Sequence, residues 1–396
     1  MGKGISMNQA GTITLYGVPL SKEAAYFTVV ADGPATLAAT VEGAYRRLGQ
    51  ALAMQGMQIL HERVFGSLDA CPSVLQARKT ALTASGRDCE TPVTYVEGQP
   101  TWGDGFAGAS VMAVRPTGAE GLATVRDAGG RVCGRSWKTH GATFTVLQSL
   151  HGNTNGKHGA DSRAVQAGRM FDVAEQLLER QGTDYRSVAR TWLYVSDILA
   201  WYSEFNRVRS GKYERFGLMP ESGARGARAI LLPASTGIEG NAATGAAVTM
   251  DLLATVLGPD SGIRVKQMSN PRQKDAFTYG SAFSRGAVIL TPDATWVSFS
   301  GTAAIDEAGR SCFPGDFRAQ MNMTLDVVEA LIAQEGAGLA DICNATLFLK
   351  SARFAAECHQ VLQERGLGGL PGVPVVADVC RDELLFEMDG MAALPR

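Results

Sequence analysis

The sequence lacks the patterns that mark several large classes of protein. Its seven cysteines form no CxxC pair and its five histidines show no HxH or HExxH spacing, so neither a disulfide framework nor a metal site is supported. No apolar run approaches the roughly 18 residues that a membrane helix needs. The start of the chain also lacks the charged, apolar and cleavage regions of a secretory signal. We therefore expect a cytoplasmic protein with reduced thiols, no metal and no membrane contact.

Charge and glycine content exclude two further classes. The chain has 37 Lys and Arg residues against 39 Asp and Glu, a net charge of −2, whereas nucleic-acid-binding proteins usually carry a basic face. None of its glycine runs forms the GxxxxGK[ST] loop of a phosphate site. We therefore expect no nucleic-acid partner, and nucleotide binding has no support. At 396 residues and 45% apolar, the chain is long enough for two or three domains with buried cores.

One pattern is present three times, in residues 41–67, 168–197 and 323–351. In each segment apolar residues recur at steps of three and four, as in Val173, Leu177 and Leu178, which indicates one buried helical face. A β-rich run follows each helix. A glycine that can end the helix stands between them, namely Gly56, Gly182 and Gly336.

The third repeat is the most complete. Before its helix, "WVSFSGTAAIDEAGRSC" predicts two strands joined by a turn at 306–309, and after it the pattern predicts a second helix and two strands. The arrangement is α+β, with mixed sheets and helices packed on one face. We predict three such units: a degenerate one at 1–135, a central one at 136–262 and a C-terminal, catalytic one at 263–396.

The last predicted strand places a carboxylate among apolar residues. Glu387 shares a face with Leu385, because residues two apart in a strand point the same way, and the other face carries Phe386 and Met388. A carboxyl in such surroundings has its charged form disfavoured, so it can hold a proton near neutral pH. The alternative is an edge-strand carboxylate that faces water.

Several other residues fit either a ligand-binding role or a structural role. Arg190, Arg209 and Arg228 could capture carboxylates through their planar guanidinium groups, or could form surface salt bridges. The stretch "PASTG" (233–237) is expected to form a turn that holds an anion or caps a strand. Cys380 is most simply a small buried apolar residue, since no histidine lies near it in the sequence.

From about residue 136 to its end, the chain resembles the chorismatases, which hydrolyse chorismate and are built from domains of the Rid/YjgF type. The motifs that carry the resemblance, in order, are "RTWLY" with "WYSEFNRVR", "LPASTGIEGN", "NPRQKDAFTYGSAFSR", "VSFSGTAAID" with "GDFRAQ", and "VCRDELLFEMD". The resemblance implies tandem Rid/YjgF-like (chorismate-mutase-like) domains. It also implies a role in secondary metabolism, no cofactor, and a homotrimer or another oligomer with sites at interfaces.

The resemblance also implies roles for single residues. In the family a glutamate at the position of Glu387 protonates the enol ether of chorismate, and pyruvate leaves. Members with a cysteine at the position of Cys380 release 3-hydroxybenzoate, whereas members with a small residue there release a dihydroxycyclohexadiene carboxylate. Arginines bind the two carboxylates of the substrate. The candidate substrate-binding residues are Arg190, Tyr194, Arg209, Arg228, Gly301 and Thr302.

Two other functions stay open at this point. One is a Rid-like deaminase of 2-imino acids, although "LPGVP" (370–374) lacks the arginine that ordinary Rid proteins place after a proline in this region. The other is a non-catalytic binder of small carboxylates. The product branch and the pathway served also stay open.

Overall fold

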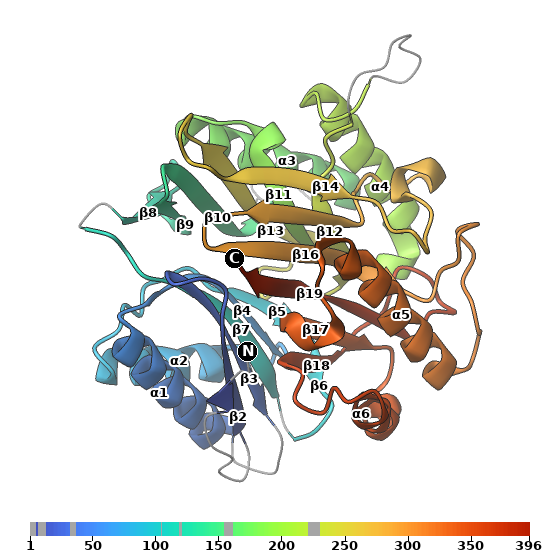
Figure 1. Ribbon diagram of the computed structural model, residues 1–396, viewed down its shortest axis with the longest axis horizontal. Coiled ribbons are helices and arrows are strands. Elements are labelled where there is room, and N and C mark those ends of the chain that lie inside the picture. Colours follow the sequence, from blue (N-terminus) through green and yellow to red (C-terminus); the bar gives the residue numbers. More distant parts are fainter. Residues whose placement is uncertain are drawn as a thin grey trace.

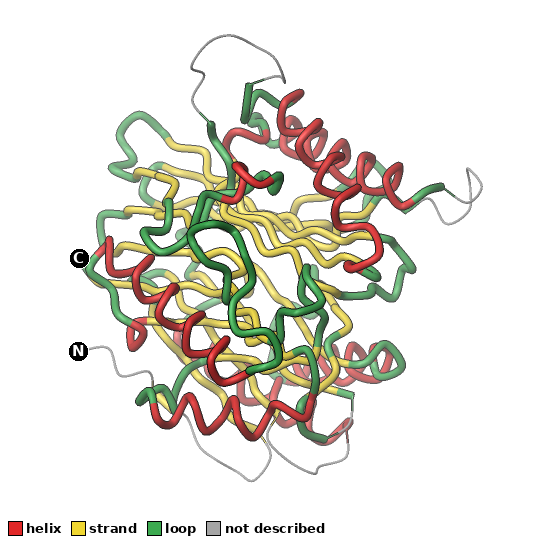
Figure 2. The backbone as a smooth tube through the Cα atoms, turned by 90° about the vertical axis from the view of Figure 1, so that its right-hand side faces the viewer, coloured by secondary structure: helices red, strands yellow, loops and turns green. Residues whose placement is uncertain are grey.

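Three mixed β-sheets form the interior of the protein, and the longer helices lie on the outside (Figures 1 and 2). The structure is a computed structural model that describes residues 5–6, 13–31, 37–103, 105–118, 121–153, 161–220 and 230–396. The α+β class and the mixed sheets predicted from the sequence are confirmed.

The three sheets repeat one strand order, in which the last strand of each unit is inserted at the centre. The first sheet and its helices comprise β1 (Ile5–Ser6), β2 (Ile13–Pro19), β3 (Ala24–Ala31), α1 (Leu37–Gln55), β4 (Gln58–Gly66), α2 (Cys71–Ala84), β5 (Thr94–Glu97) and β7 (Phe106–Val114). The second sheet and its helices comprise β8 (Leu122–Arg126), β9 (Val132–Thr139), β10 (Ala142–His151), α3 (Arg163–Arg180), β11 (Val188–Val195), α4 (Ile198–Arg215), β12 (Ala234–Glu239) and β13 (Val248–Leu257). The third comprise β14 (Arg264–Met268), β15 (Gly286–Leu290), β16 (Ala294–Ala303), α5 (Phe317–Ile332), β17 (Ile342–Leu349), α6 (Ala355–Glu364), β18 (Gly372–Val376) and β19 (Phe386–Pro395).

The predicted domain division stays a prediction. Strand β9 belongs to the second sheet and runs across residue 135, where the sequence placed the first boundary. A short strand of the first unit, β6 (Gln99–Pro100), pairs with β18 and so joins the third sheet. The sheets are therefore linked along the chain as well as through their packing.

The predicted repeat of helix, glycine and strand is present in all three units. Gly56, Gly182 and Gly336 adopt φ values of 62°, 75° and 82°, the left-handed conformation that glycine reaches without a steric cost. Strands β4, β11 and β17 follow these glycines, and each pairs in parallel with the strand after the next helix.

One predicted strand is reduced to a single pair. The turn at 306–309 is present, with Gly309 at a φ of 79°, but only Ile305 and Ser311 form a β-bridge across it. The chain then turns at Phe313 towards α5, which begins after Asp316. The Asp316 carboxylate accepts a hydrogen bond from the backbone N–H of Ala319, an N-cap that starts the helix at once and leaves no room for a longer strand.

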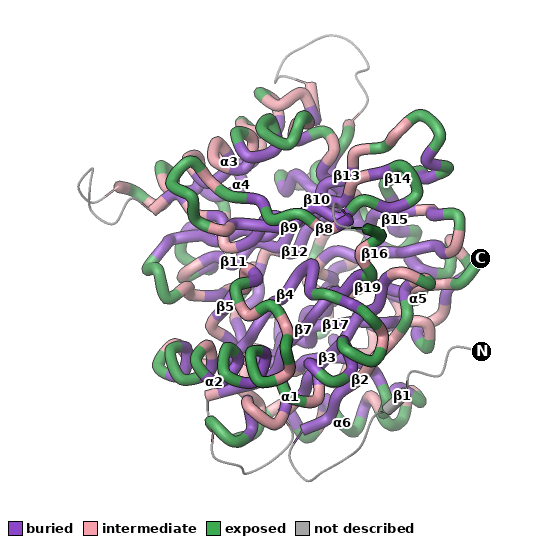
Figure 3. The backbone as a smooth tube through the Cα atoms, turned by 90° about the vertical axis from the view of Figure 1, so that its left-hand side faces the viewer, coloured by how far each residue is buried: buried purple, intermediate pink, exposed green. Residues whose placement is uncertain are grey.

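The buried apolar residues form one central and three outer clusters. The central cluster lies between the sheets and includes Tyr26, Trp192 and Trp296, one from each sheet. Each outer cluster fills the space between one sheet and its helices. Figure 3 shows the same arrangement, with buried strands inside and exposed helix faces outside. Side chains that point inward from all three sheets therefore meet at the middle.

The cysteines and the helices bear on the expected reduced thiols and on the expected lack of a membrane helix. All seven cysteines lie in the described part of the chain, and all are free thiols. Within the described ranges, no helix is both long and apolar enough to cross a membrane.

Candidate functional site

Glu387 lies in the interior of the third sheet. It is the second residue of β19, where its neighbours across the sheet are Ala303 of β16 and Phe348 of β17. The residue is only 4% exposed. The predicted strand and the burial of this carboxyl are therefore confirmed, and the reading of an edge carboxylate facing water is wrong because strands lie on both sides of β19.

A bulge in β16 makes room for the Glu387 carboxyl. The register between β16 and β19 shifts between Phe299 and Thr302, and Gly301 lies in this irregularity. A Cβ atom on Gly301 would lie 2.2 Å from Oε1 of Glu387, so only glycine leaves this space open. The Thr302 hydroxyl donates instead to the backbone carbonyl of Ser300 at 2.8 Å.

Burial changes the acidity of Glu387. Removal from water, reinforced by the nearby negative charge of Asp389, raises the pKa of Glu387 from 4.5 to about 8, against the opposing effect of Arg190 and Arg285. The carboxyl therefore keeps its proton at neutral pH. A buried carboxylic acid of this kind can donate a proton to a bound molecule.

Arg190 extends from the second sheet towards β19. It is 1% exposed, and its Nη2 donates to the Thr236 hydroxyl at 2.5 Å and to Asp389 Oδ2 at 3.1 Å. Its guanidinium carbon lies 4.9 Å from the ring centre of Trp192. Its Nη1 is buried and has no hydrogen-bond partner among the described residues. One donor nitrogen of this guanidinium is thus unpaired within the described part of the chain.

Asp389 connects the three sheets. Its Oδ2 also accepts a hydrogen bond from the Thr236 hydroxyl at 2.7 Å and lies 3.7 Å from Nη1 of Arg63 on β4. Arg63 in turn donates to Asn344 Oδ1 at 3.4 Å and to the hydroxyl of Tyr194 at 3.5 Å. The Tyr194 hydroxyl therefore lies beside an arginine of the first sheet.

Cys380 lies in the segment between β18 and β19 and is half-buried. Burial, and after it the charge of Glu387, raises the pKa of the Cys380 thiol to about 12. The thiol is therefore neutral at physiological pH, which makes a thiolate nucleophile unsuitable here. Cys380 therefore lies close enough to Glu387 for the charge of one to act on the other.

Arg209 is fully buried on α4. Its Nη2 donates to Asn206 Oδ1 at 2.6 Å, and its guanidinium carbon lies 5.6 Å from the ring centres of both Phe205 and Phe283. Its Nε has no hydrogen-bond partner among the described residues. The charge of Arg209 also acts on Cys380, so that Arg209 faces the same region. Arg228, the remaining candidate, lies outside the described residues.

Sequence reasoning missed four residues of this region: Arg63, Thr236, Arg285 and Asp389. The stretch 233–237, expected to form a turn, is mostly strand β12, and its pairing with β11 directs Thr236 towards Asp389. Asp389 carried a usable signal, because it stands two residues after Glu387 and so shares its face. Arg63 carried none, because its position depends on how the first sheet packs against the third.

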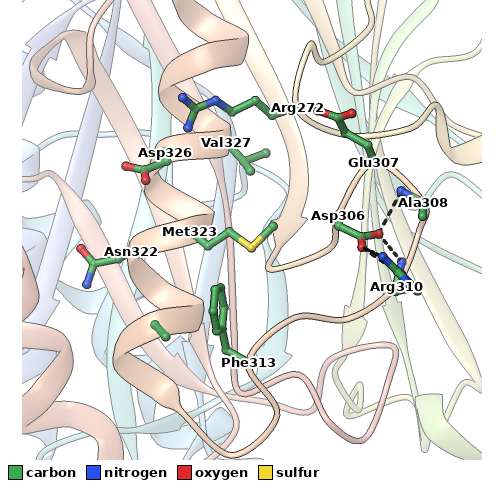
Figure 4. Close-up of a pocket in the computed structure, with 11 residues that line it drawn as sticks. Arg272, Asp306, Glu307, Ala308, Arg310, Phe313, Asn322, Met323, Asp326 and Val327 are labelled. Atoms are coloured by element: carbon green, nitrogen blue, oxygen red, sulfur yellow. Dashed lines mark hydrogen bonds and ion pairs between the residues drawn. The ribbon is translucent and has the colours of Figure 1, made fainter.

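A hollow of about 790 Å³ lies elsewhere, between α5 and the turn at 306–309 (Figure 4). Its lining includes Arg272, Phe313 and Met323 but none of the candidate site residues. The Asp306 carboxylate in its wall is satisfied by the backbone and side chain of Arg310, which closes the turn. The Asp306 carboxylate is therefore already paired within the protein.

Metal ligands are not grouped in the described part of the chain. No three His, Cys, Asp or Glu side chains there are arranged to hold a metal ion. The chemical groups that meet around β19 are a protonated carboxyl, a thiol, a carboxylate and several guanidinium groups. Such a set can bind an anion and transfer a proton to it.

The chain is similar in sequence to several known proteins. Residues 274–375 match the family described as Endoribonuclease L-PSP. A chorismatase from Streptomyces rapamycinicus is 27% identical over 264 residues, which are 60% of this chain and 71% of that protein. A 3-hydroxybenzoate synthase from Streptomyces hygroscopicus is 26% identical over 243 residues, which are 54% of this chain and 66% of that protein.

The fold has a counterpart among solved structures. A chorismatase crystal structure superposes with a TM-score of 0.58 at 22% identity and covers 85% of this chain and 93% of its own. The tandem Rid/YjgF-like fold predicted from the sequence is confirmed by this match and by the repeated strand order.

Proposed function

We propose that this chain, a member of the chorismatase family, cleaves the enol ether of chorismate and releases pyruvate. The observation that carries the proposal is the buried carboxyl of Glu387, whose pKa of about 8 leaves it protonated at neutral pH. Acid-catalysed cleavage of an enol ether needs a proton donor close to the terminal methylene carbon of the substrate. Glu387 is such a donor, in a site that is shielded from water.

The reaction follows from the electron demand of the enol ether. The double bond takes the proton from Glu387 at its methylene carbon, and the neighbouring carbon becomes an oxocarbenium ion. The resulting Glu387 carboxylate stabilises this cation electrostatically. In the diene branch a water molecule adds to this cationic carbon, the bond from that carbon to the ring oxygen breaks, and the side chain leaves as pyruvate while the ring keeps a hydroxyl group. In the 3-hydroxybenzoate branch the bond between that oxygen and the ring carbon breaks, and the side chain leaves with the oxygen as pyruvate. The neighbouring ring hydroxyl oxygen then moves to the vacated carbon, and the Glu387 carboxylate takes back the proton that the ring loses as it becomes aromatic. Formation of 3-hydroxybenzoate consumes no net water, whereas formation of the dihydroxylated diene consumes one water molecule.

The charge of the site suits a dianion. Arg190, Arg209 and Arg285 surround the region of Glu387 and Cys380, and Asp389 balances only part of this positive charge. Arginine binds carboxylates through two parallel hydrogen bonds. We infer that Nη1 of Arg190 and Nε of Arg209, which have no hydrogen-bond partner among the described residues, are donors to the substrate.

For the product, we propose the 3-hydroxybenzoate branch. The support is Cys380, which stands where the cysteine-bearing chorismatases have theirs, and the relative named 3-hydroxybenzoate synthase. A neutral thiol beside the ring has more bulk than a methyl group and leaves less room for an attacking water. Cys380→Ala is expected to shift part of the product to the non-aromatic diol. An unchanged product ratio on chromatography would make Cys380 a packing residue.

Incubation of the purified protein with chorismate tests the proposed function. Pyruvate is followed through a coupled lactate dehydrogenase, and the ring product is identified by chromatography against 3-hydroxybenzoate. Release of both in equal amounts is the expected result. Failure to release pyruvate would overturn the proposal, and the same protein would then be assayed as a deaminase of 2-imino acids and as a binder of small carboxylates.

A further inference from the structure

Asp389 has more partners than a single buried salt bridge: two arginines and a threonine hydroxyl. Its partners Arg190 and Arg63 come from the second and first sheets, while Asp389 itself is in the third. Thr236 completes the cluster with a hydroxyl that accepts from Arg190 and donates to Asp389. All four residues are almost fully buried. The carboxylate is therefore held at one place, on the same face of β19 as Glu387.

We propose that Asp389 is a positioning residue of the acid site: it holds the guanidinium of Arg190 through Nη2, leaves Nη1 for a substrate carboxylate, and places a fixed negative charge beside Glu387. This inference rests on the proposed cleavage of chorismate. Arg63 is then the contribution of the first unit to the site, since its guanidinium lies 3.7 Å from Asp389 and offsets part of the negative charge.

The unsatisfied donor of Arg190 supports the first part of the proposal. A buried N–H group without an acceptor costs free energy, and proteins seldom keep one without a use. Because Asp389 and Thr236 both bind Nη2, they leave Nη1 without a protein acceptor among the described residues. A carboxylate of the substrate is the acceptor that a guanidinium group prefers.

The charges around Glu387 support the second part. Arg190 on β11 and Arg285 ahead of β15 lower the pKa of Glu387, whereas burial and Asp389 raise it. The Cys380 thiol, which also interacts with Glu387, is neutral. Burial is therefore the main reason that Glu387 keeps its proton, and the negative charge of Asp389 adds to it against two neighbouring cations.

A second interface provides a matched control. Asp251 occupies in β13 the register position that Asp389 occupies in β19. It is just as buried, accepts a hydrogen bond from the Thr94 hydroxyl at 2.7 Å and pairs with His61 Nε2 at 2.8 Å. The position that corresponds to Glu387 is Thr249, which carries no acid. Asp251 is therefore the same kind of interface carboxylate without the acid site.

The test compares Asp389→Asn with Asp251→Asn in the full chain. In wild type, kcat/KM for chorismate should fall as the pH rises through about 8, because the free acid must be protonated. In Asp389→Asn the midpoint should move down by roughly one to two pH units, the effect of one charge at a spacing of about 7 Å in a protein interior. In Asp251→Asn the profile should keep its wild-type midpoint, even if the melting temperature falls.

A second readout does not depend on turnover. The carboxyl of Glu387 can be titrated by carbon-13 NMR in the substrate-free protein, with Glu387→Gln used to assign the signal. The midpoint should fall in Asp389→Asn and stay constant in Asp251→Asn. Unchanged midpoints in Asp389→Asn by both methods would overturn the inference and leave Asp389 a structural ion pair. If wild type releases no pyruvate, the proposed function fails, while the titration still decides the effect of Asp389.

Asp389→Asn leaves two buried arginines less balanced and could fail to fold. Thr236→Val is the second variant, because valine keeps the shape and removes only the hydroxyl that joins Arg190 to Asp389. Its KM for chorismate should rise about fivefold, the worth of roughly one hydrogen bond, with a smaller change in kcat. Thr94→Val is its control and should leave KM unchanged. Equal KM values in wild type and Thr236→Val would contradict the anchoring of Arg190.

Discussion

Replacing Glu387 by glutamine is expected to make the protein more stable, and the gain should grow with pH. In the folded state the carboxyl holds its proton up to a pH of about 8, whereas in the unfolded chain it ionises near 4.5. Between these values unfolding releases a proton, so rising pH favours the unfolded state of the wild type. Glutamine has the same shape and no proton to release. The difference between the two proteins should therefore be smallest below pH 4.5 and level off above pH 8.

The size of this effect follows from the two pKa values. Each pKa unit corresponds to about 1.4 kcal/mol, so the free energy of unfolding of wild type relative to Glu387→Gln should fall by about 3 kcal/mol between pH 4.5 and 7. The full difference above pH 8 should be roughly 5 kcal/mol. Glu387 is only 4% exposed, so solvent screens its charge little.

Urea unfolding of both proteins at pH 5, 7 and 8.5 measures this difference directly. Glu307→Gln is a matched control, because Glu307 lies exposed on the turn after β16. Its unfolding free energy relative to wild type should depend little on pH. A constant difference between wild type and Glu387→Gln over this pH range would refute the reasoning, because Glu387 would then be ionised in the folded protein and unable to donate a proton.

Three further substitutions test the geometry of the site. Arg190→Lys or Arg209→Lys keeps the charge and removes the planar guanidinium. The KM for chorismate should therefore rise about fivefold or more, with little change in melting temperature. A collapse of the melting temperature instead would identify a structural ion pair. Gly301→Ala places a methyl group 2.2 Å from Oε1 of Glu387 and must displace the carboxyl group of Glu387. Turnover should therefore fall by at least about tenfold. The far-ultraviolet circular dichroism spectrum should stay that of wild type. Full turnover in Gly301→Ala would mean that the carboxyl acts from another position.

Local patterns in the sequence were sufficient to predict the repeated elements. The helical spacing of apolar residues depends only on neighbouring residues, and so do the helix ends at Gly56, Gly182 and Gly336. The structure has all three helices and all three glycines at these places. The burial of Glu387 was also predictable, since both faces of its strand looked apolar. These inferences concern single elements, for which periodicity is a direct signal.

The set of residues that forms the site was harder to predict from the sequence, because it depends on how the three sheets pack together. Arg63 lies 326 positions before Asp389 in the chain, and no local pattern indicates that β4 approaches β19. Thr236 was assigned to a turn because Pro, Ser and Gly dominate its surroundings, but pairing with β11 makes it a strand residue. Tertiary pairing overrides turn propensity at this position.

A comparison of wild type with Glu387→Gln shows whether Glu387 supplies the proton that cleaves chorismate. Pyruvate release from chorismate is measured at neutral pH for wild type and for Glu387→Gln, with chorismate binding followed by calorimetry in parallel. The variant should still bind chorismate and release pyruvate about a hundredfold or more slowly, because an amide fills the space but cannot donate the proton. Near-normal turnover by Glu387→Gln would contradict the account.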